Sequence, residues 1–188
     1  MKTTSGSLPL KSGSSSFPSS AHATALELLR LLALGAAAVA LHAAMRHRIE
    51  IGPGHQGLWW MALLLIGRLT SRQRWAGVVE GAGAAAATQL PLWHLGDPFL
   101  WLAFVLAGAV VDVGFASVGT RALWALALLG GIAHATKPLI RVVLQFGGLR
   151  YESLLHGAAF PTATHFAFGA IGAFIGAALV RAGTRQRV

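Results

Sequence analysis

The stretch THFAFGAIGAFIGAAL, at residues 164–179, decides the fold class, because almost every residue in it is apolar or small. The apolar run around it covers about twenty residues, which is the length that an α-helix needs to cross a bilayer. Five further apolar stretches precede it. The sequence therefore predicts an all-α protein, a six-helix transmembrane bundle. The predicted spans are 25–45, 57–69, 75–93, 98–118, 120–146 and 159–182.

Composition favours the same class. Hydrophobic residues make up 55% of the chain and charged residues only 11%, with a mean hydropathy of +0.62, whereas a soluble domain carries about a quarter charged residues. The chain has no cysteine, which excludes disulfides and thiolate metal sites. Its net charge of +9 comes from basic residues in short loops between apolar runs. Such residues orient spans against anionic lipid, so we do not expect a nucleic-acid partner.

The first residues form a separate region. Residues 1–20 are rich in Ser, Gly and Pro and show no helical apolar period, so we expect a disordered tail at 1–24 and a membrane domain at 25–188. A cytoplasmic N-terminus places ten basic residues inside and five outside. By the positive-inside rule, this bias predicts a multi-pass protein of the cell (inner) membrane with both termini in the cytoplasm.

Several residues within the predicted spans lead to specific structural predictions. The run 81–87 of glycine and alanine should allow neighbouring helices to pack closely. Pro138 should kink the fifth span or end its membrane part. Glu80, toward the cytoplasmic side, is expected to pair with Arg68 or Arg72. Asp112 is left open as a substrate, proton-carrying or packing residue.

Polar residues gather at the predicted outer end. His134, Lys137 and Arg141 are spaced three and four residues apart, so they share one face of the fifth span. A face with these residues should line a cavity that opens outward rather than meet lipid tails. Two plainer interpretations remain open. His134 could be an interhelical hydrogen-bonding residue, and the two basic side chains could extend to lipid headgroups.

The outer loop before the second span adds further candidates. The sequence GPGHQG at 52–57 predicts a structured turn, and Trp59 follows it directly. Such a loop could cap a pocket in which an indole stacks on a flat ligand. The predicted substrate-binding residues are His55, Gln56, Trp59, His134, Lys137, Arg141 and His165.

This combination resembles the S-component of energy-coupling factor (ECF) transporters, small membrane subunits that capture a vitamin or related micronutrient. Six spans in under 200 residues, cytoplasmic termini and a polar outer end are shared features. The stretch at 164–179, with a histidine at its outer end, is similar to the closing helix of that family. In the first span, small residues repeat at four-residue spacing. They are similar to the surface that meets the coupling subunit, and they are Ala33, Ala36, Ala37 and Ala40.

The resemblance implies a binding subunit that is not an enzyme and needs no cofactor. Its partners would be a small-molecule micronutrient, a transmembrane coupling subunit and paired ATPases. The sequence itself contains no G-x-x-x-x-G-K-[ST] phosphate-binding loop. Histidines, a basic face and tryptophans suit an aromatic or anionic ligand.

Two rival functions come from other classes. His42, His134 and His165 lie on three different predicted spans and could bind haem or a metal ion, although no H-x-x-E-H or H-E-x-x-H pair is present. We therefore assign no metal ligand. A membrane hydrolase would need a nucleophile, but Ser117 in FASVGT lacks the G-x-S-x-G context.

Overall fold

The computed structural model of the chain describes residues 20–45, 53–91, 97–118, 122–155 and 157–186, and it is all-helical over these ranges, as predicted. No β-strand occurs among them. The helices are α1 (Ser20–Met45), α2 (Gly57–Thr70), α3 (Ala76–Thr88), α4 (Leu100–Val118), α5 (Leu123–Phe146), the short 3-10 helix η2 (Glu152–Leu154) and α6 (Ala159–Arg185).

Four of these helices, namely α1, α4, α5 and α6, are long and apolar enough to cross a membrane, as expected of a multi-pass membrane protein. The other two are shorter, with 14 residues in α2 and 13 in α3. At 1.5 Å per residue each is roughly 20 Å long, against a hydrocarbon core of about 30 Å. The prediction of a six-span bundle is thus supported for four helices.

Two helix boundaries in the structure differ from the predicted ones. The third span was expected over 75–93, but α3 ends at Thr88. Pro91 follows three residues later and disfavours helical backbone at the residue before it. At the N-terminus, α1 already begins at Ser20, so residues 20–24 are helical rather than part of a tail. The rest of the predicted tail, residues 1–19, lies outside the described residues.

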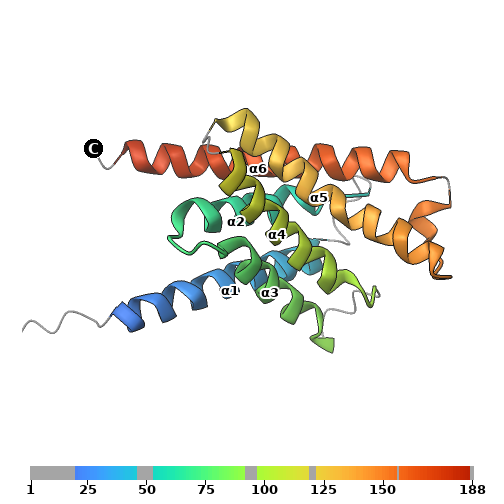
Figure 1. Ribbon diagram of the computed structural model, residues 1–188, viewed down its shortest axis with the longest axis horizontal. Helices are drawn as coiled ribbons and strands as arrows, with labels where there is room; N and C mark the ends of the chain where they lie inside the picture. The colour runs from blue at the N-terminus through green and yellow to red at the C-terminus, as the bar shows by residue number, and fades with distance from the viewer. Residues whose placement is uncertain (1–19, 46–52, 92–96, 119–121, 156, 187–188) are drawn as a thin grey trace, which may run out of the picture.

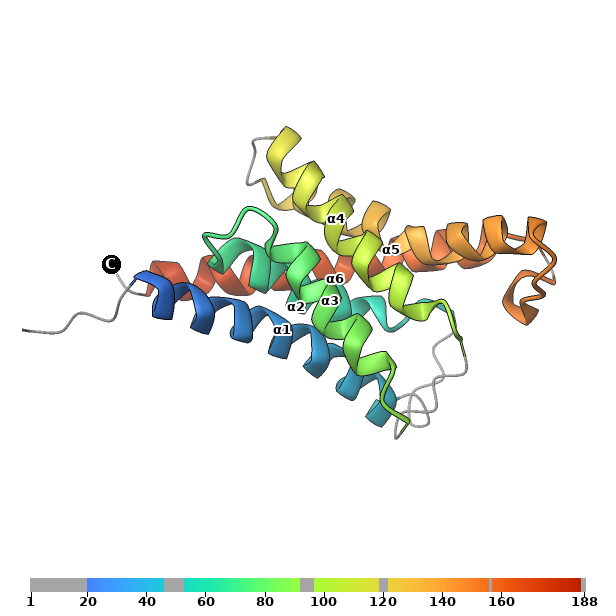
Figure 2. The same ribbon diagram turned by 60° about the horizontal axis from the view of Figure 1, so that its bottom comes forward.

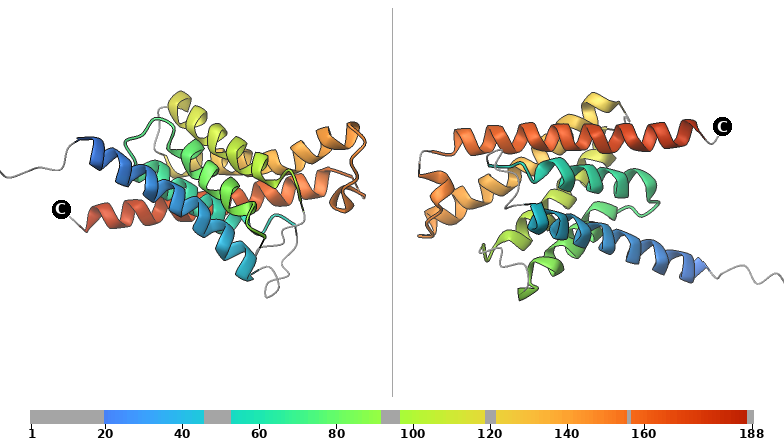
Figure 3. Two further views of the ribbon diagram at one scale, coloured as in Figure 1. Left: turned by 90° about the horizontal axis from the view of Figure 1, so that it is seen from below. Right: turned by 180° about the vertical axis from the view of Figure 1, so that it is seen from behind.

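The helices alternate in direction, so α1 begins and α6 ends at the same end of the bundle, here called the termini end (Figure 1). Around the bundle α1 packs on α3, α3 on α4, α4 on α5, and α5 on α6. Figure 2 shows α3 between α1 and α4. The right-hand view of Figure 3 shows α2 between α1 and α6. Because α2 also contacts α3 and α5, it is the most central helix.

Small residues allow these close approaches, as predicted for the run 81–87. A Cβ added at Gly81 would come within 2.6 Å of the carbonyl oxygen of Phe104 on α4, and one at Gly83 would overlap the backbone of Leu32 on α1. Gly77 and Gly108 meet in the same way. Helix packing in a membrane relies on such contacts, because lipid provides no hydrophobic drive between helices.

The fifth helix does not end at Pro138. It continues through this fully buried proline to Phe146. Proline lacks an N–H, so Pro138 cannot donate the usual hydrogen bond to the carbonyl of His134 one turn earlier. The helix thus runs on through the proline, and His134 lies midway along it. That Pro138 kinks the span or ends its membrane part stays a prediction.

Near the termini end, the acidic residues are arranged differently from the expectation. The Nε of Arg68 lies 3.1 Å from Oδ1 of Asp112, not beside Glu80. The carboxylate of Asp112 also accepts the N–H groups of Gly77 (3.0 Å) and Val78 (2.9 Å). These N–H groups belong to the first turn of α3, which has no helical acceptor for them. Asp112 therefore has a structural role.

Glu80 itself is fully buried between α1, α2 and α3. Neither of its carboxylate oxygens has a hydrogen-bond partner among the described residues. Arg72, the other expected partner, donates its backbone N–H to Oε1 of Glu27 at 2.7 Å. The expected pairing of Glu80 with either arginine is absent from the part of the chain that is described.

Candidate ligand-binding site

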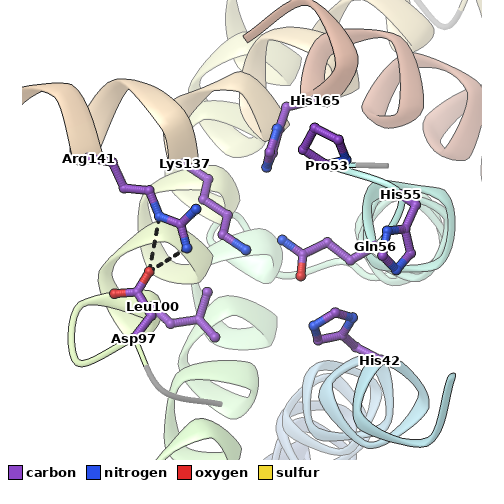
Figure 4. A pocket seen from close by; sticks show the side chains of 10 residues that line it. His42, Pro53, His55, Gln56, Asp97, Leu100, Lys137, Arg141 and His165 are labelled. Carbon is purple, nitrogen blue, oxygen red and sulfur yellow. Dashed lines mark hydrogen bonds and ion pairs between the residues drawn. The ribbon is translucent and has the colours of Figure 1, made fainter. Parts of the chain in front are cut away.

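A cavity of about 300 Å³ lies at the end of the bundle opposite the termini. Five segments contribute to it: the end of α1, the loop at 53–56, the residues before and at the start of α4, the second half of α5, and α6 (Figure 4). Its lining residues are His42, Pro53, Gly54, His55, Gln56, Asp97, Leu100, Lys137, Arg141 and His165.

The loop at 53–56 is fixed against α5 and α6 by Gly54. This residue has φ +88°, a conformation that favours glycine, and an added Cβ would come within 2.8 Å of the Cα of His165. Its carbonyl oxygen accepts hydrogen bonds from the backbone of Gly57 (2.8 Å) and from Nε2 of His134 (3.1 Å). Residues 53–56 of the GPGHQG stretch thus form the structured turn that was predicted, and α2 follows it directly; Gly52 lies outside the described residues.

Two histidines behind this loop are held by backbone carbonyls. The rings of His134 and His165 stack with centroids 5.0 Å apart. Nδ1 of His165 lies 2.7 Å from the carbonyl oxygen of Pro161. A carbonyl can only accept, so the bonded nitrogen of each ring must carry the hydrogen. In the neutral rings, Nδ1 of His134 and Nε2 of His165 are therefore acceptors.

Arg141 lines the cavity but is largely engaged by the protein. Its Nη2 and Nε donate to Oδ2 of Asp97 at 2.7 and 3.1 Å, and its Nη1 donates to the hydroxyl of Ser153 at 3.1 Å. The guanidinium also lies over the ring of Tyr151, 5.3 Å from its centroid. Arg141 therefore joins α5 to the start of α4 and to η2, and Asp97 balances its charge.

Lys137 differs from its neighbour one turn away. No hydrogen bond or ion pair joins its side chain to any residue in the described ranges. Figure 4 shows its ammonium group and the amide of Gln56 pointing toward each other across the cavity. Gln56 is only 6% exposed, and within the described ranges its side chain also has no hydrogen-bond partner. A half-buried ammonium and a buried amide thus face the cavity without a hydrogen-bond partner among the described residues.

The structure brings most of the predicted site residues together. His55, Gln56, Lys137, Arg141 and His165 line the cavity. His134 lies behind it and supports the loop through Gly54. Trp59 does not line it: its ring packs edge-on against His55, with centroids 6.1 Å apart, and its buried Nε1 has no hydrogen-bond partner among the described residues. A direct stacking role for this indole is not favoured.

Asp97 was not predicted as a site residue, although it lines the cavity and balances the charge of Arg141. A local signal was available, because Asp97 is followed by Pro98 at the start of a predicted helix, a pattern typical of a helix N-terminus. Its Oδ1 accepts the N–H of Phe99 at 3.1 Å. Its pairing with Arg141, 44 residues away, has no such signal.

The predicted partner surface on α1 is partly open. Ala33 and Ala37 are exposed on the outer face of the helix, and Ala36 and Ala40 are half-buried. Exposed small residues are compatible with a close helix–helix contact. The contact itself stays a prediction.

Among the described residues, the histidines show no arrangement typical of a metal site. In the described part of the chain, no group of three or more His, Cys, Asp or Glu side chains could hold a metal ion. His134 and His165 each direct one ring nitrogen to a carbonyl, and the ring of His42 lies beside that of His55, with centroids 6.0 Å apart.

Comparison of the chain with protein-family models, with curated proteins and with solved structures finds no match. The resemblance to ECF S-components therefore stays a prediction. The function has to be inferred from the cavity and from the helices that hold it.

Proposed function

We propose that this chain is the substrate-capturing membrane subunit of an ECF-type uptake transporter for a micronutrient, a vitamin or its precursor. The ligand enters the cavity from outside, and a separate coupling subunit with paired ATPases supplies the energy. The observation that carries the proposal is a 300 Å³ cavity in a membrane bundle, in which the side chains of Lys137 and Gln56 have no hydrogen-bond partner among the described residues.

The size and lining of the cavity support ligand binding. Small-molecule sites begin at about 300 Å³ and combine an apolar frame with a few convergent polar groups. Leaving a buried polar group without a hydrogen bond costs about 1–3 kcal/mol. The buried amide of Gln56 therefore weakens the fold unless water or a ligand completes its hydrogen bonds, and the half-buried ammonium of Lys137 beside it has no partner among the described residues. Such groups are expected where binding, rather than stability, has been optimised.

Other features of the chain support the assignment of ligand capture to this protein and of ATP hydrolysis to a partner. The sequence has no phosphate-binding loop, so hydrolysis of ATP is assigned to a partner. The positive-inside bias of the sequence, ten basic residues against five, supports a cytoplasmic location for the termini and an outward-facing cavity. The exposed Ala33 and Ala37 offer a surface where a partner helix can approach closely.

The test is purification of the full chain from membranes, followed by mass spectrometry of bound small molecules and of co-purified proteins. We expect a stoichiometric small molecule that is lost from the Lys137→Met variant. Arg150→Met is the matched control, because Arg150 is an exposed cation near the same end but does not line the cavity. Purified protein with neither a bound small molecule nor a coupling subunit, even when the coupling module is co-expressed, would overturn the proposal.

A further inference from the structure

We infer that the cavity is built for a small monocarboxylate that also carries an N–H group. Its carboxylate is held by Lys137 and Gln56, and its N–H donates to Nε2 of His165. This inference rests on the proposed function and names the chemical class of its ligand.

The charge of the cavity is the first reason. Among the described residues that line the cavity, Asp97 is the only acidic one, and Arg141 already uses it in an ion pair of 2.7 Å. That pair leaves the ammonium of Lys137 as a positive charge with no acidic counterpart in the lining. A buried charge normally has a partner. Since the described part of the chain provides no acidic partner for Lys137, we assign the negative charge to the ligand.

The side chain opposite Lys137 indicates a carboxylate. The amide of Gln56 is directed at the ammonium across the cavity (Figure 4), and it can donate a hydrogen bond through its NH₂ group. An ammonium and an amide N–H that converge from two sides match the two oxygens of one carboxylate, and hydrogen bonds to a charged group are the strong ones.

On the other side of the cavity, His165 offers a hydrogen-bond acceptor, so the ligand is expected to carry a hydrogen-bond donor there. Nδ1 of His165 is committed to the carbonyl of Pro161 at 2.7 Å, so Nε2 of the neutral ring is an acceptor. No described residue donates a hydrogen bond to this Nε2, and His165 lines the cavity. The stacked ring of His134 behind it fixes its orientation. A ligand N–H completes this last site.

The amount of charge distinguishes a carboxylate from a phosphate ester. A phosphate monoester carries about −1.5 to −2 charges at neutral pH, whereas Lys137 supplies a single uncompensated positive charge. The second negative charge would have no unpaired cationic side chain to balance it among the described lining residues. A cavity of about 300 Å³ also suits a compact molecule.

Three small probes of nearly the same shape test the inference on the full chain in detergent, with binding followed by calorimetry or ligand-observed NMR at neutral pH. Pyrrole-2-carboxylate has both required groups, pyrrole-2-carboxamide lacks the charge, and furan-2-carboxylate lacks the N–H. We expect the pyrrole acid to bind about tenfold or more tightly than its amide, because charge-assisted hydrogen bonds are lost in the amide. We expect it also to bind more tightly than the furan acid.

Variants assign these preferences to residues. Lys137→Met should abolish the preference for the acid over the amide while the amide still binds. His165→Phe keeps an aromatic ring against His134 and should abolish only the preference for pyrrole over furan. Arg150→Met should change neither ratio.

Equal binding of acid and amide, an unchanged ratio in Lys137→Met, or no binding of any probe up to about 10 mM would overturn the monocarboxylate assignment. The co-purification experiment decides separately about the transport role. A protein that retains a neutral or cationic micronutrient would refute the ligand class and leave the proposed function standing.

Discussion

The contact between α5 and α6 that positions the two histidines provides a direct test of the structure. A Cβ added at Gly169 would lie 2.5 Å from the Cβ of His134 and 2.7 Å from the carbonyl oxygen of Gly130. Both neighbours belong to α5 and neither is the end of a flexible side chain. Gly169→Ala therefore requires the two helices to move apart, which disturbs the stacking of His134 on His165.

The magnitude follows from two opposing effects. Overpacking a well-filled contact costs about 1–3 kcal/mol. Replacing glycine by alanine inside a helix also gains up to about 1 kcal/mol through helix propensity. Gly183→Ala is the matched control on the same helix, because a Cβ there meets nothing within 4 Å. Since both variants share the propensity gain, Gly169→Ala should be about 1–3 kcal/mol less stable than Gly183→Ala. This is roughly a 5- to 150-fold difference in the folding equilibrium.

Reversible unfolding in mixed micelles, followed by circular dichroism, measures this difference. The same two variants should also differ in ligand affinity, because only the first one lies beside the cavity. Stabilities that agree within about 0.5 kcal/mol, the usual scatter of surface substitutions, would refute the close packing of α5 on α6 around Gly169.

Two further predictions concern the ion pairs. Asp112→Asn removes the charge opposite Arg68 and one acceptor of the α3 first turn. In the same assay, the free energy of unfolding should therefore fall by about 3–5 kcal/mol. A decrease below about 1 kcal/mol would contradict the structural role of this pair. Tyr151 is the single tyrosine of the chain, so ultraviolet titration reports on it alone. Its pKa should lie above the usual value, because partial burial and the negative charge of Asp97 both disfavour the phenolate. Asp97→Asn should lower this pKa, and a pKa that the substitution does not move would show that Asp97 and Tyr151 are not close.

The sequence was sufficient to predict the helices that are apolar throughout. The starts of α2 at Gly57 and α6 at Ala159 were predicted to the residue, because turn residues or a change in apolarity mark them. The face formed by His134, Lys137 and Arg141 was also predictable, since helical spacing alone puts the three residues on one side. Local periodicity and turn chemistry contain this information.

Other features depend on partners that are distant in the sequence. The pairings of Arg68 with Asp112 and of Arg141 with Asp97 each join residues 44 positions apart, and no local pattern encodes which acid meets which base. The length of α3 was overestimated for a different reason. Alanine and glycine continue the apolar pattern up to Thr88, but Pro91 disfavours helical backbone at the residue before it, so the helix ends before the predicted span does.

The uncompensated charge of Lys137 also bears on membrane voltage. Moving one elementary charge through the full potential changes the free energy by about 2.3 kcal/mol per 100 mV. A bound monoanion cancels the ammonium charge, so a loaded cavity that turns toward the cytoplasm would cross the field as a neutral pair. The empty cavity would return as a cation, against an interior-negative potential. In such a cycle the resting voltage would leave delivery of the ligand unaffected and would slow the recovery of the empty protein.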